Sequence, residues 1–125
     1  KKKVTLIKKG KDAITEYRVL NSFKNMFSKI ECKIITGRTH QIRAHMLSMG
    51  CPLLGDKLYA KGRNIPKNIS KDIILLIKNI KRQALHAKKI TFKHPIKDEI
   101  LSFESKIPND IKKLEYALFD DPKLI

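Results

Sequence analysis

The sequence contains no tryptophan, few other aromatic residues and only two cysteines, Cys32 and Cys51, among its 125 residues. Two cysteines are too few for a disulfide-rich scaffold and fit the reducing cytosol, so the predicted localisation is cytoplasmic. The longest apolar run covers residues 73–77, far short of the ~20 residues that span a bilayer. No stretch has the order of a signal peptide. The sequence therefore predicts neither a membrane segment nor secretion.

Residue patterns for metal ions and nucleotide cofactors are also missing. There is no Cys-x-x-Cys pair, and His40 and His45 are five residues apart, whereas two ligands on one helical face are four apart. No Gly-x-x-x-x-Gly-Lys loop is present. Cys32 falls in an apolar strand pattern and Cys51 precedes a proline, which disfavours a cysteine nucleophile. We predict no metal site and no cofactor.

Acidic residues are scarce: 12 stand against 28 lysines and arginines, which gives a net charge of +16. Such an excess favours a polyanionic partner, most often nucleic acid, although a genome rich in A and T would also raise the lysine content. Residues 1–62 carry 14 basic and 4 acidic side chains, whereas residues 98–125 carry 4 and 7. The surface that meets a polyanion should therefore lie in the first hundred residues.

Hydrophobic periodicity predicts one α+β domain. Alternating patterns indicate strands, and apolar residues at helical spacing indicate helices. The predicted strands cover residues 11–20, 29–35, 84–93 and 100–107, with a turn region at 21–28, and the predicted helices cover residues 39–49, 70–81 and 108–119. In the strand at 84–93, the neighbours Leu85 and His86 should face opposite sides, so that one is buried and the other exposed. This order implies a mainly antiparallel sheet with helices packed on one face.

Three residues are expected to mark helix ends. Thr39 and Ser70 are of the types that cap a helix N-terminus, and Gly50 can end a helix in a left-handed conformation.

The densest polar cluster is Thr36-Gly37-Arg38-Thr39-His40-Gln41-Ile42-Arg43-Ala44-His45, where a strand runs through a glycine turn into a helix. His40 and Arg43 are three residues apart and share a helical face, which should point away from Ile42 and Met49. Arginine suits a forked contact with a carboxylate or a phosphate. The plainer interpretation is an amphipathic helix whose basic face is simply solvated.

This cluster and three later blocks resemble the RNA pseudouridine synthases. The branch concerned modifies large-subunit ribosomal RNA and some transfer RNA. The further blocks are Pro52-Leu53-Leu54-Gly55-Asp56-Lys57-Leu58-Tyr59, then Arg82-Gln83-Ala84-Leu85-His86-Ala87, then Phe92-Lys93-His94-Pro95. The alternation of Ala13, Thr15, Tyr17 and Val19 matches the strand pair that precedes them in the family.

The resemblance implies a bacterial isomerase that converts uridine to pseudouridine in large-subunit (23S) ribosomal RNA without a cofactor. An aspartate attacks the nucleotide, the glycosidic bond breaks, the base turns, and C5 bonds to the ribose. By motif position, Arg43 pairs with that aspartate and Leu85 packs against the flipped base. The residues that we then expect to contact RNA are Arg38, Thr39, His40, Gln41, His45, Arg82 and His86.

The family's catalytic aspartate lies in a His-Arg-Leu-Asp block, followed by a Lys-x-Tyr block, and neither is present. The seven aspartates stand at 12, 56, 72, 98, 110, 120 and 121, none in that context. Residues 1–125, which begin with a lysine, are thus predicted to be the C-terminal half of the catalytic domain. That half is expected to be monomeric, to be inactive alone and to need the N-terminal half. Arg43 should be either exposed or bound to another acceptor.

Other interpretations stay open at this point. The chain could be a non-catalytic basic RNA-binding fragment, a gene remnant, one half of a split enzyme, or a structural module of the ribosome. The sequence leaves open which uridine is modified, whether this half folds alone, and whether an RNA-binding domain of the S4 type precedes it.

Overall fold

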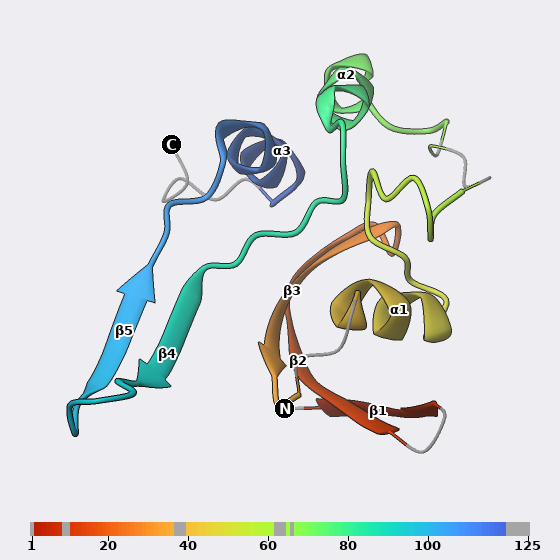
Figure 1. Cartoon of the computed structure of the whole chain (residues 1–125). Coiled ribbons are helices and arrows are strands. Elements are labelled where there is room, and N and C mark those ends of the chain that lie inside the picture. The colour runs from red at the N-terminus through yellow and green to blue at the C-terminus, as the bar shows by residue number, and fades with distance from the viewer. Residues whose placement is uncertain (1, 9–10, 37–39, 62–64, 66, 120–125) are drawn as a thin grey trace.

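The computed structural model describes residues 2–8, 11–36, 40–61, 65 and 67–119. Figure 1 shows a curved sheet that encloses one helix, a pair of helices at the far end of that sheet, and a separate two-stranded ribbon. The strands are β1 (Lys2–Lys8), β2 (Lys11–Phe23), β3 (Phe27–Ile34), β4 (Lys89–Lys93) and β5 (Ile100–Glu104). The helices are α1 (Gln41–Ser48), α2 (Lys71–Asn79) and α3 (Asn109–Phe119).

β1, β2 and β3 form one antiparallel sheet in that order. The predicted hairpin of β2 and β3 is confirmed, but the predicted turn at 21–28 is too long. β2 continues to Phe23, and the turn is tight because Lys24 and Asn25 both adopt positive φ angles, 47° and 58°. Two such residues in succession make the turn whose twist matches a hairpin. The register shifts between Val19 and Asn21, where the long β2 has a bulge or irregularity.

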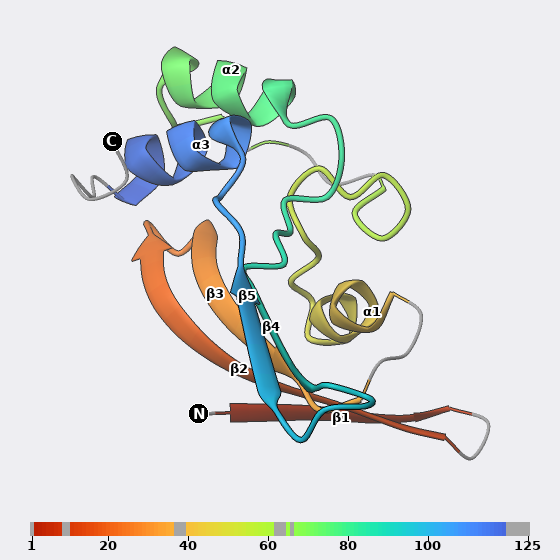
Figure 2. The ribbon, with the colours of Figure 1, turned by 60° about the vertical axis from the view of Figure 1, so that its left-hand side comes forward.

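α1 lies on the concave side of this sheet, against β1 and β2 (Figure 2). Its N-terminal flanking residue is His40, in the left-handed region at φ 51°, whose side chain makes no capping hydrogen bond. The predicted cap, Thr39, lies outside the described residues. At the other end Gly50 has φ 75°, which confirms the predicted left-handed termination.

A polar network attaches α1 to the sheet. Gln41 donates from Nε2 to the Ile14 carbonyl (2.7 Å) and to Thr15 Oγ1 (2.9 Å), and its Oε1 accepts from Thr36 Oγ1 (2.7 Å). His45 Nδ1 lies 2.7 Å from Thr15 Oγ1. Gln41, His45 and Met46 are the buried residues of α1, so directional hydrogen bonds hold this helix where an apolar stripe is the usual means.

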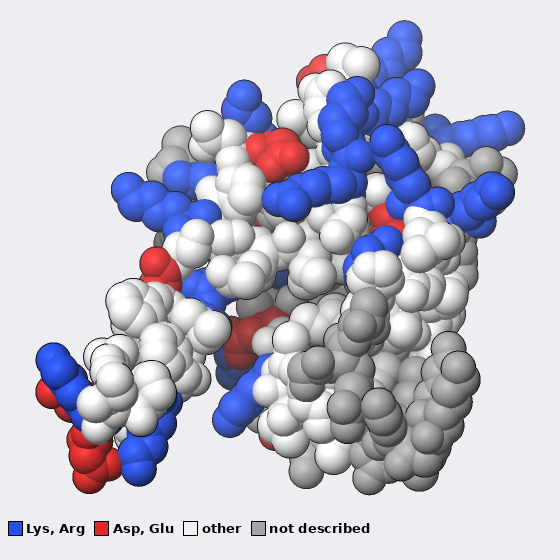
Figure 3. Space-filling model, viewed as in Figure 1, with Lys and Arg blue, Asp and Glu red and all other residues white. Residues whose placement is uncertain are grey.

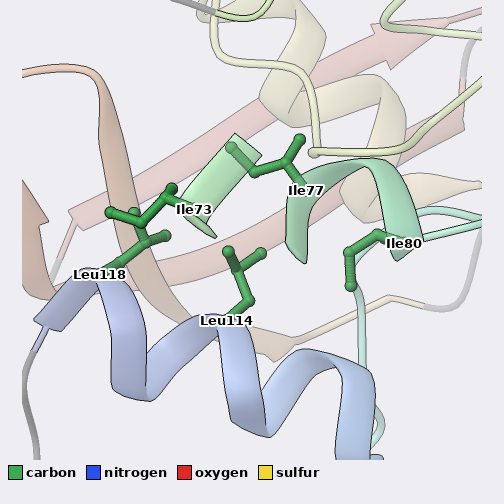
Figure 4. Close-up of a cluster of buried hydrophobic side chains, with 5 residues drawn as sticks. All are labelled: Ile73, Ile77, Ile80, Leu114 and Leu118. Atoms are coloured by element: carbon green, nitrogen blue, oxygen red, sulfur yellow. The ribbon is translucent and has the colours of Figure 1, made fainter. Parts of the chain in front are cut away.

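The apolar core lies at the opposite end, between α2 and α3. It consists of Ile73, Ile77, Ile80, Leu114 and Leu118, whose side chains converge between the two helices (Figure 4). Phe23 and Phe27, from the tip of the β2–β3 hairpin, pack against it. Ser70 caps α2 as predicted, because its Oγ accepts from Ile73 N at 3.3 Å.

β4 and β5 form a separate antiparallel ribbon, which confirms the second predicted hairpin. The predicted strand at 84–93 is only partly correct, because residues 84–88 are irregular and β4 begins at Lys89. Phe92 and Phe103 stack across the ribbon with ring centroids 5.9 Å apart. Almost every residue of the ribbon is exposed.

The predicted α+β class is confirmed, with two corrections. The strands form two separate sheets, and the strand β1 (Lys2–Lys8) was not predicted. No helix in the described ranges is long and apolar enough to cross a membrane.

Gly55 allows the loop after α1 to lie close to the segment after α2. Its φ is 75°, and a Cβ at this position would collide with the Arg82 carbonyl oxygen and lie 2.8 Å from Ile80 Cγ2. Next to it, Ala84 N donates to the Leu54 carbonyl at 2.7 Å. Residues 54–55 and 80–84 therefore pack backbone against backbone.

This packing predicts that Gly55→Ala destabilises the fold more than Gly50→Ala. Both glycines have φ 75°, but a Cβ at Gly50 would meet nothing within 4 Å. Gly50→Ala should cost only the left-handed penalty of about 1–2 kcal/mol, whereas Gly55→Ala adds a backbone collision. Urea denaturation of both variants measures the difference. Equal losses would contradict the close approach at Gly55.

Candidate functional site

A hollow of about 290 Å³ lies where the end of β3, the start of α1 and the segment after α2 meet. Its lining residues are Ile34, His40, Gln41, Ile42, Arg43, Gln83 and Leu85. Four of the predicted site residues therefore come together: His40, Gln41, Arg43 and Leu85. Ile42, which we expected on the opposite helical face from His40 and Arg43, lines the same hollow.

Arg43 makes a two-pronged contact with Asp56. Its Nε donates to Asp56 Oδ2 at 2.7 Å and its Nη2 donates to Oδ1 at 2.8 Å. The side chain of Arg43 is mostly covered and that of Asp56 is completely buried. Of the two alternatives predicted for Arg43, exposure or binding to another acceptor, the structure shows the second. This contact also raises the pKa of Arg43.

The carboxylate oxygens of Asp56 accept several hydrogen bonds. Besides the two bonds from Arg43, its Oδ1 accepts from the backbone N–H groups of Leu58 and Tyr59, each at 3.1 Å. The Arg43 contact, followed by these backbone bonds, lowers the pKa of Asp56 to about 2. A carboxylate so strongly stabilised is a poor nucleophile and a poor base. Asp56 is therefore suited to hold Arg43 and unsuited to attack a substrate.

Tyr59 covers the outer side of this ion pair. The Arg43 guanidinium carbon lies 5.0 Å from the centre of its ring, a cation–π distance. The His40 ring meets the same tyrosine edge-on, with centroids 5.9 Å apart, and His40 Nδ1 lies 3.3 Å from the Tyr59 hydroxyl. His40, Arg43 and Tyr59 thus form one contiguous group at the hollow.

Gln41 and His45, expected to contact RNA, belong to the buried network. They are only 5% and 1% exposed, and the contacts above direct both side chains toward Ile14 and Thr15. Burial also lowers the pKa of His45, so the neutral ring is favoured. These positions favour a role in holding α1 on the sheet over a contact with RNA.

The remaining predicted residues are placed as follows. Arg82 is exposed, directly after α2. His86 is half-buried, with Nε2 3.0 Å from the Ser105 carbonyl oxygen, and Leu85 is half-buried as well. The expected split into one buried and one exposed neighbour is therefore wrong, because this segment is not a regular strand. Arg38 and Thr39 lie outside the described residues.

Sequence reasoning missed Asp56, Tyr59 and Gln83 as residues of the site. The first two stand in the Gly55-Asp56-Lys57-Leu58-Tyr59 block that carried the resemblance, and Gln83 precedes Leu85. Asp56 does not stand in the context of the family's nucleophile, so the sequence assigns it no role. Its position in a block that carries the resemblance was the signal that could have identified it as a site residue.

Within the described ranges, no three histidine, cysteine, aspartate or glutamate residues are grouped to hold a metal ion. Cys32 is half-buried, Cys51 is exposed, and both are free thiols. Burial raises the pKa of Cys32, and the neighbouring Glu31 adds to the effect, which makes its thiolate scarce.

Comparison with known proteins matches the part of the chain that contains β1 to α1. Residues 2–48 match the family model described as RNA pseudouridylate synthase. Over these residues the chain is similar to the RNA pseudouridylate synthase family. The hollow that Arg43 lines is the candidate functional site.

Three relatives from different bacteria carry the same name. A protein named ribosomal large subunit pseudouridine synthase D, from Haemophilus influenzae, is 41% identical over 112 residues, which is 90% of this chain and 34% of the relative. Its counterparts in Vibrio cholerae and Xanthomonas campestris are 41% and 38% identical, over 92% and 90% of this chain. The chain spans about a third of the length of the curated relatives that it matches.

Because Asp56 is buried and ionised, we predict that the free energy of unfolding depends on pH in the acid range. Asp56→Ala should lower the free energy of unfolding by roughly 3 kcal/mol, the scale of removing one partner from a buried ion pair. The folded-state pKa of about 2 lies below that of an unfolded aspartate, near 4. The contribution of Asp56 is therefore complete above about pH 4 and disappears as the pH falls toward 2.

Urea denaturation at several pH values measures this effect. The matched control is Asp98→Ala. Asp98 also belongs to an ion pair, with Lys93, but its side chain is 93% exposed, and exposed ion pairs contribute little to stability. If both variants lose the same stability at pH 7, the Arg43–Asp56 pair does not hold the site.

Proposed function

We propose that this chain forms one wall of the active site, and part of the RNA-binding surface, of a pseudouridine synthase that acts on large-subunit ribosomal RNA. The observation that carries the proposal is the fixed guanidinium of Arg43 beside a hollow that Leu85 lines. The family and the names of the relatives support it. We further propose that the protein works as a monomer in the cytoplasm of a bacterium.

Arg43 is suited to hold a second carboxylate. A guanidinium has five N–H donors, and Asp56 receives two of them. The others can hold the catalytic aspartate that the family carries in a His-Arg-Leu-Asp block. Since a fixed cation favours the ionised form of a neighbouring carboxyl group, Arg43 would keep that nucleophile charged.

The hollow is suited to a single flipped base. Its volume of about 290 Å³ is at the small end of ligand sites. Leu85, Ile34 and Ile42 provide apolar surface against which a planar base can pack, while Gln83 offers an amide for hydrogen bonding. A base inside a stack has to be extruded before an enzyme can rearrange it.

The proposed reaction is an isomerisation. The bond between the ribose C1′ and the base N1 breaks, a bond between C1′ and C5 forms, and no atom or electron is lost overall. The proposal therefore needs no cofactor. What the protein has to supply is a nucleophile, a cation to keep it charged and an apolar seat for the turning base.

RNA binding without catalysis is the second candidate for the 125-residue chain by itself. The observation that favours it is the state of Asp56, the carboxylate that Arg43 contacts. Its oxygens accept four hydrogen bonds and its pKa is held near 2. The wall of the site described above thus contains the positioning cation without a reactive carboxylate.

We expect the 125-residue chain alone to form no pseudouridine. The assay incubates it with unmodified large-subunit ribosomal RNA and maps pseudouridine chemically, with the Haemophilus influenzae relative as the positive control. Turnover above background by the chain alone would show that one of its own residues is the nucleophile.

Arg43 should be essential for turnover in a complete enzyme. The test uses a chimera in which this chain replaces the matching third of the Haemophilus influenzae relative. Arg43→Ala should lower the single-turnover rate by roughly 100-fold or more, the scale of removing one preorganised charge contact, and leave RNA affinity nearly unchanged. Arg43→Lys should not restore the rate, because a point charge cannot make a forked contact.

The control for this experiment is Arg18→Ala. Arg18 also bonds a carboxylate, that of Glu31 at 2.9 Å, but on the exposed surface of the sheet. Its loss should leave the rate unchanged. If Arg43→Ala turns over like the unaltered chimera, Arg43 serves only to hold Asp56 and its loop in place, and the proposed function loses its main support.

A further inference from the structure

The segment that contains α2 carries a large share of the charge. From Lys57 to Arg82 the chain has eight lysine or arginine residues and a single acidic residue, Asp72. This net charge of +7 in 26 residues approaches half of the total of +16. The basic excess is therefore concentrated in a short part of the sequence.

The fold gathers these side chains on one surface. Those that the structure describes are all exposed, and Figure 3 shows lysine and arginine crowded over α2 and the segment before it. We name this surface the basic ridge; it consists of Lys57, Lys61, Lys67, Lys71, Lys78, Lys81 and Arg82. The opposite face of α2 packs into the core through Ile73 and Ile77, so the lysines of this helix lie on its exposed side.

The charges of the ridge are not balanced within the fold. The four ion pairs found among the described residues involve Arg18, Lys29, Arg43 and Lys93, none of which belongs to the ridge. Like charges gathered without counter-charges repel one another. Such a surface favours a partner that brings closely spaced negative charges.

The ridge is joined to the hollow by close backbone packing. Arg82 ends the ridge, its carbonyl oxygen faces Gly55, and Leu85 lines the hollow three residues later. Because Gly55 precedes Asp56, the contact that positions Arg43 and the end of the ridge belong to one packed unit. An RNA strand whose base occupies the hollow would have its neighbouring backbone within reach of the ridge.

The residue types on the ridge indicate which feature of RNA it contacts. Six of its seven members are lysines, which suit phosphate as point charges. Proteins that bind unpaired strands add aromatic side chains on which bases stack. The one aromatic residue between 57 and 82 is Tyr59, and it already packs against Arg43 and His40.

We infer that the basic ridge docks the phosphate backbone of a paired RNA stem next to the flipped nucleotide. This inference rests on the proposed function for the identity of the polymer. The inference adds three points to that function. It names the surface that docks RNA, it assigns that surface to paired RNA, and it assigns docking to residues other than Arg43.

The test compares two sets of four substitutions in the 125-residue chain. The ridge variant changes Lys67, Lys71, Lys78 and Lys81 to glutamine. The control variant changes Lys88, Lys89, Lys97 and Lys106, which are equally exposed and outside the ion pairs. Both variants lose the same charge, and thermal melting checks that both fold. The probes are a short RNA hairpin and an unpaired RNA of the same length.

We expect the unaltered chain to bind the hairpin more tightly than the unpaired RNA. Its affinity should fall on the order of tenfold or more between 50 and 200 mM salt. The ridge variant should bind the hairpin at least about tenfold more weakly, with a log–log salt slope smaller by about one for each lysine that contacts a phosphate. The control variant should keep the affinity and slope of the unaltered chain.

Equal losses in both variants would overturn the inference, because attraction would then depend on total charge alone. An unchanged hairpin affinity in the ridge variant would also overturn it, and compositional bias would then explain the abundance of lysine. Preference for the unpaired RNA would overturn the assignment to a stem. Because these are binding measurements on the 125-residue chain, they test the ridge separately from the reaction, and their outcome stands even if the chimera assay fails.

Discussion

The contact between Arg43 and Asp56 is the constraint on which the geometry of the site depends. A buried carboxylate is stable only when its charge is compensated and its oxygens accept hydrogen bonds, and Arg43 supplies the charge and two of the bonds. The contact fixes the start of α1 relative to the loop that contains Gly55. That loop in turn packs on the backbone around Arg82, and the segment after Arg82 lines the hollow. One ion pair thus coordinates three separate stretches of chain.

The two ends of the molecule are stabilised by different physics. α2 and α3 share an apolar cluster, where burial of side chains such as Ile77 and Leu114 provides non-directional stability. α1 is held by hydrogen bonds among Gln41, His45 and Thr15, which tolerate little change in angle or distance. A directional network is the appropriate support for a helix that has to aim Arg43 into a small hollow, because a slide along an apolar contact would cost little.

Charge is also divided between two tasks. In the hollow, the positive charge of Arg43 is held in a fixed direction by Asp56, so it acts at short range through its remaining N–H groups. On the basic ridge, the charges have no such partner and act over a distance set by the ionic strength. In the proposed enzyme, long-range attraction of RNA and short-range control of a carboxylate are therefore performed by different residues of one packed unit.

Local patterns were sufficient to predict the α+β class, both hairpins, the cap at Ser70 and the three helices, because these features depend on the spacing of neighbours and on turn or cap residues. Arg43 and Leu85 were singled out by the resemblance of the motif blocks, which lie in the family's order along the chain. The burial of Gln41 and His45 could not be predicted, because a polar residue is buried only if a distant partner such as Thr15 satisfies it.

The partner of Arg43 was beyond local reasoning for the same reason. Nothing in the spacing of Arg43 and Asp56, 13 residues apart, shows that the loop folds back onto α1. The sequence by itself determined which chemistry is available: an arginine fork, an apolar floor and an excess of lysine. Tertiary structure alone decided that Asp56 binds the guanidinium of Arg43 and that the lysines gather on one side of α2. It also decided that the loop with Asp56 and the end of the basic ridge pack together at Gly55. Contacts between distant segments depend on packing that no short stretch of sequence contains.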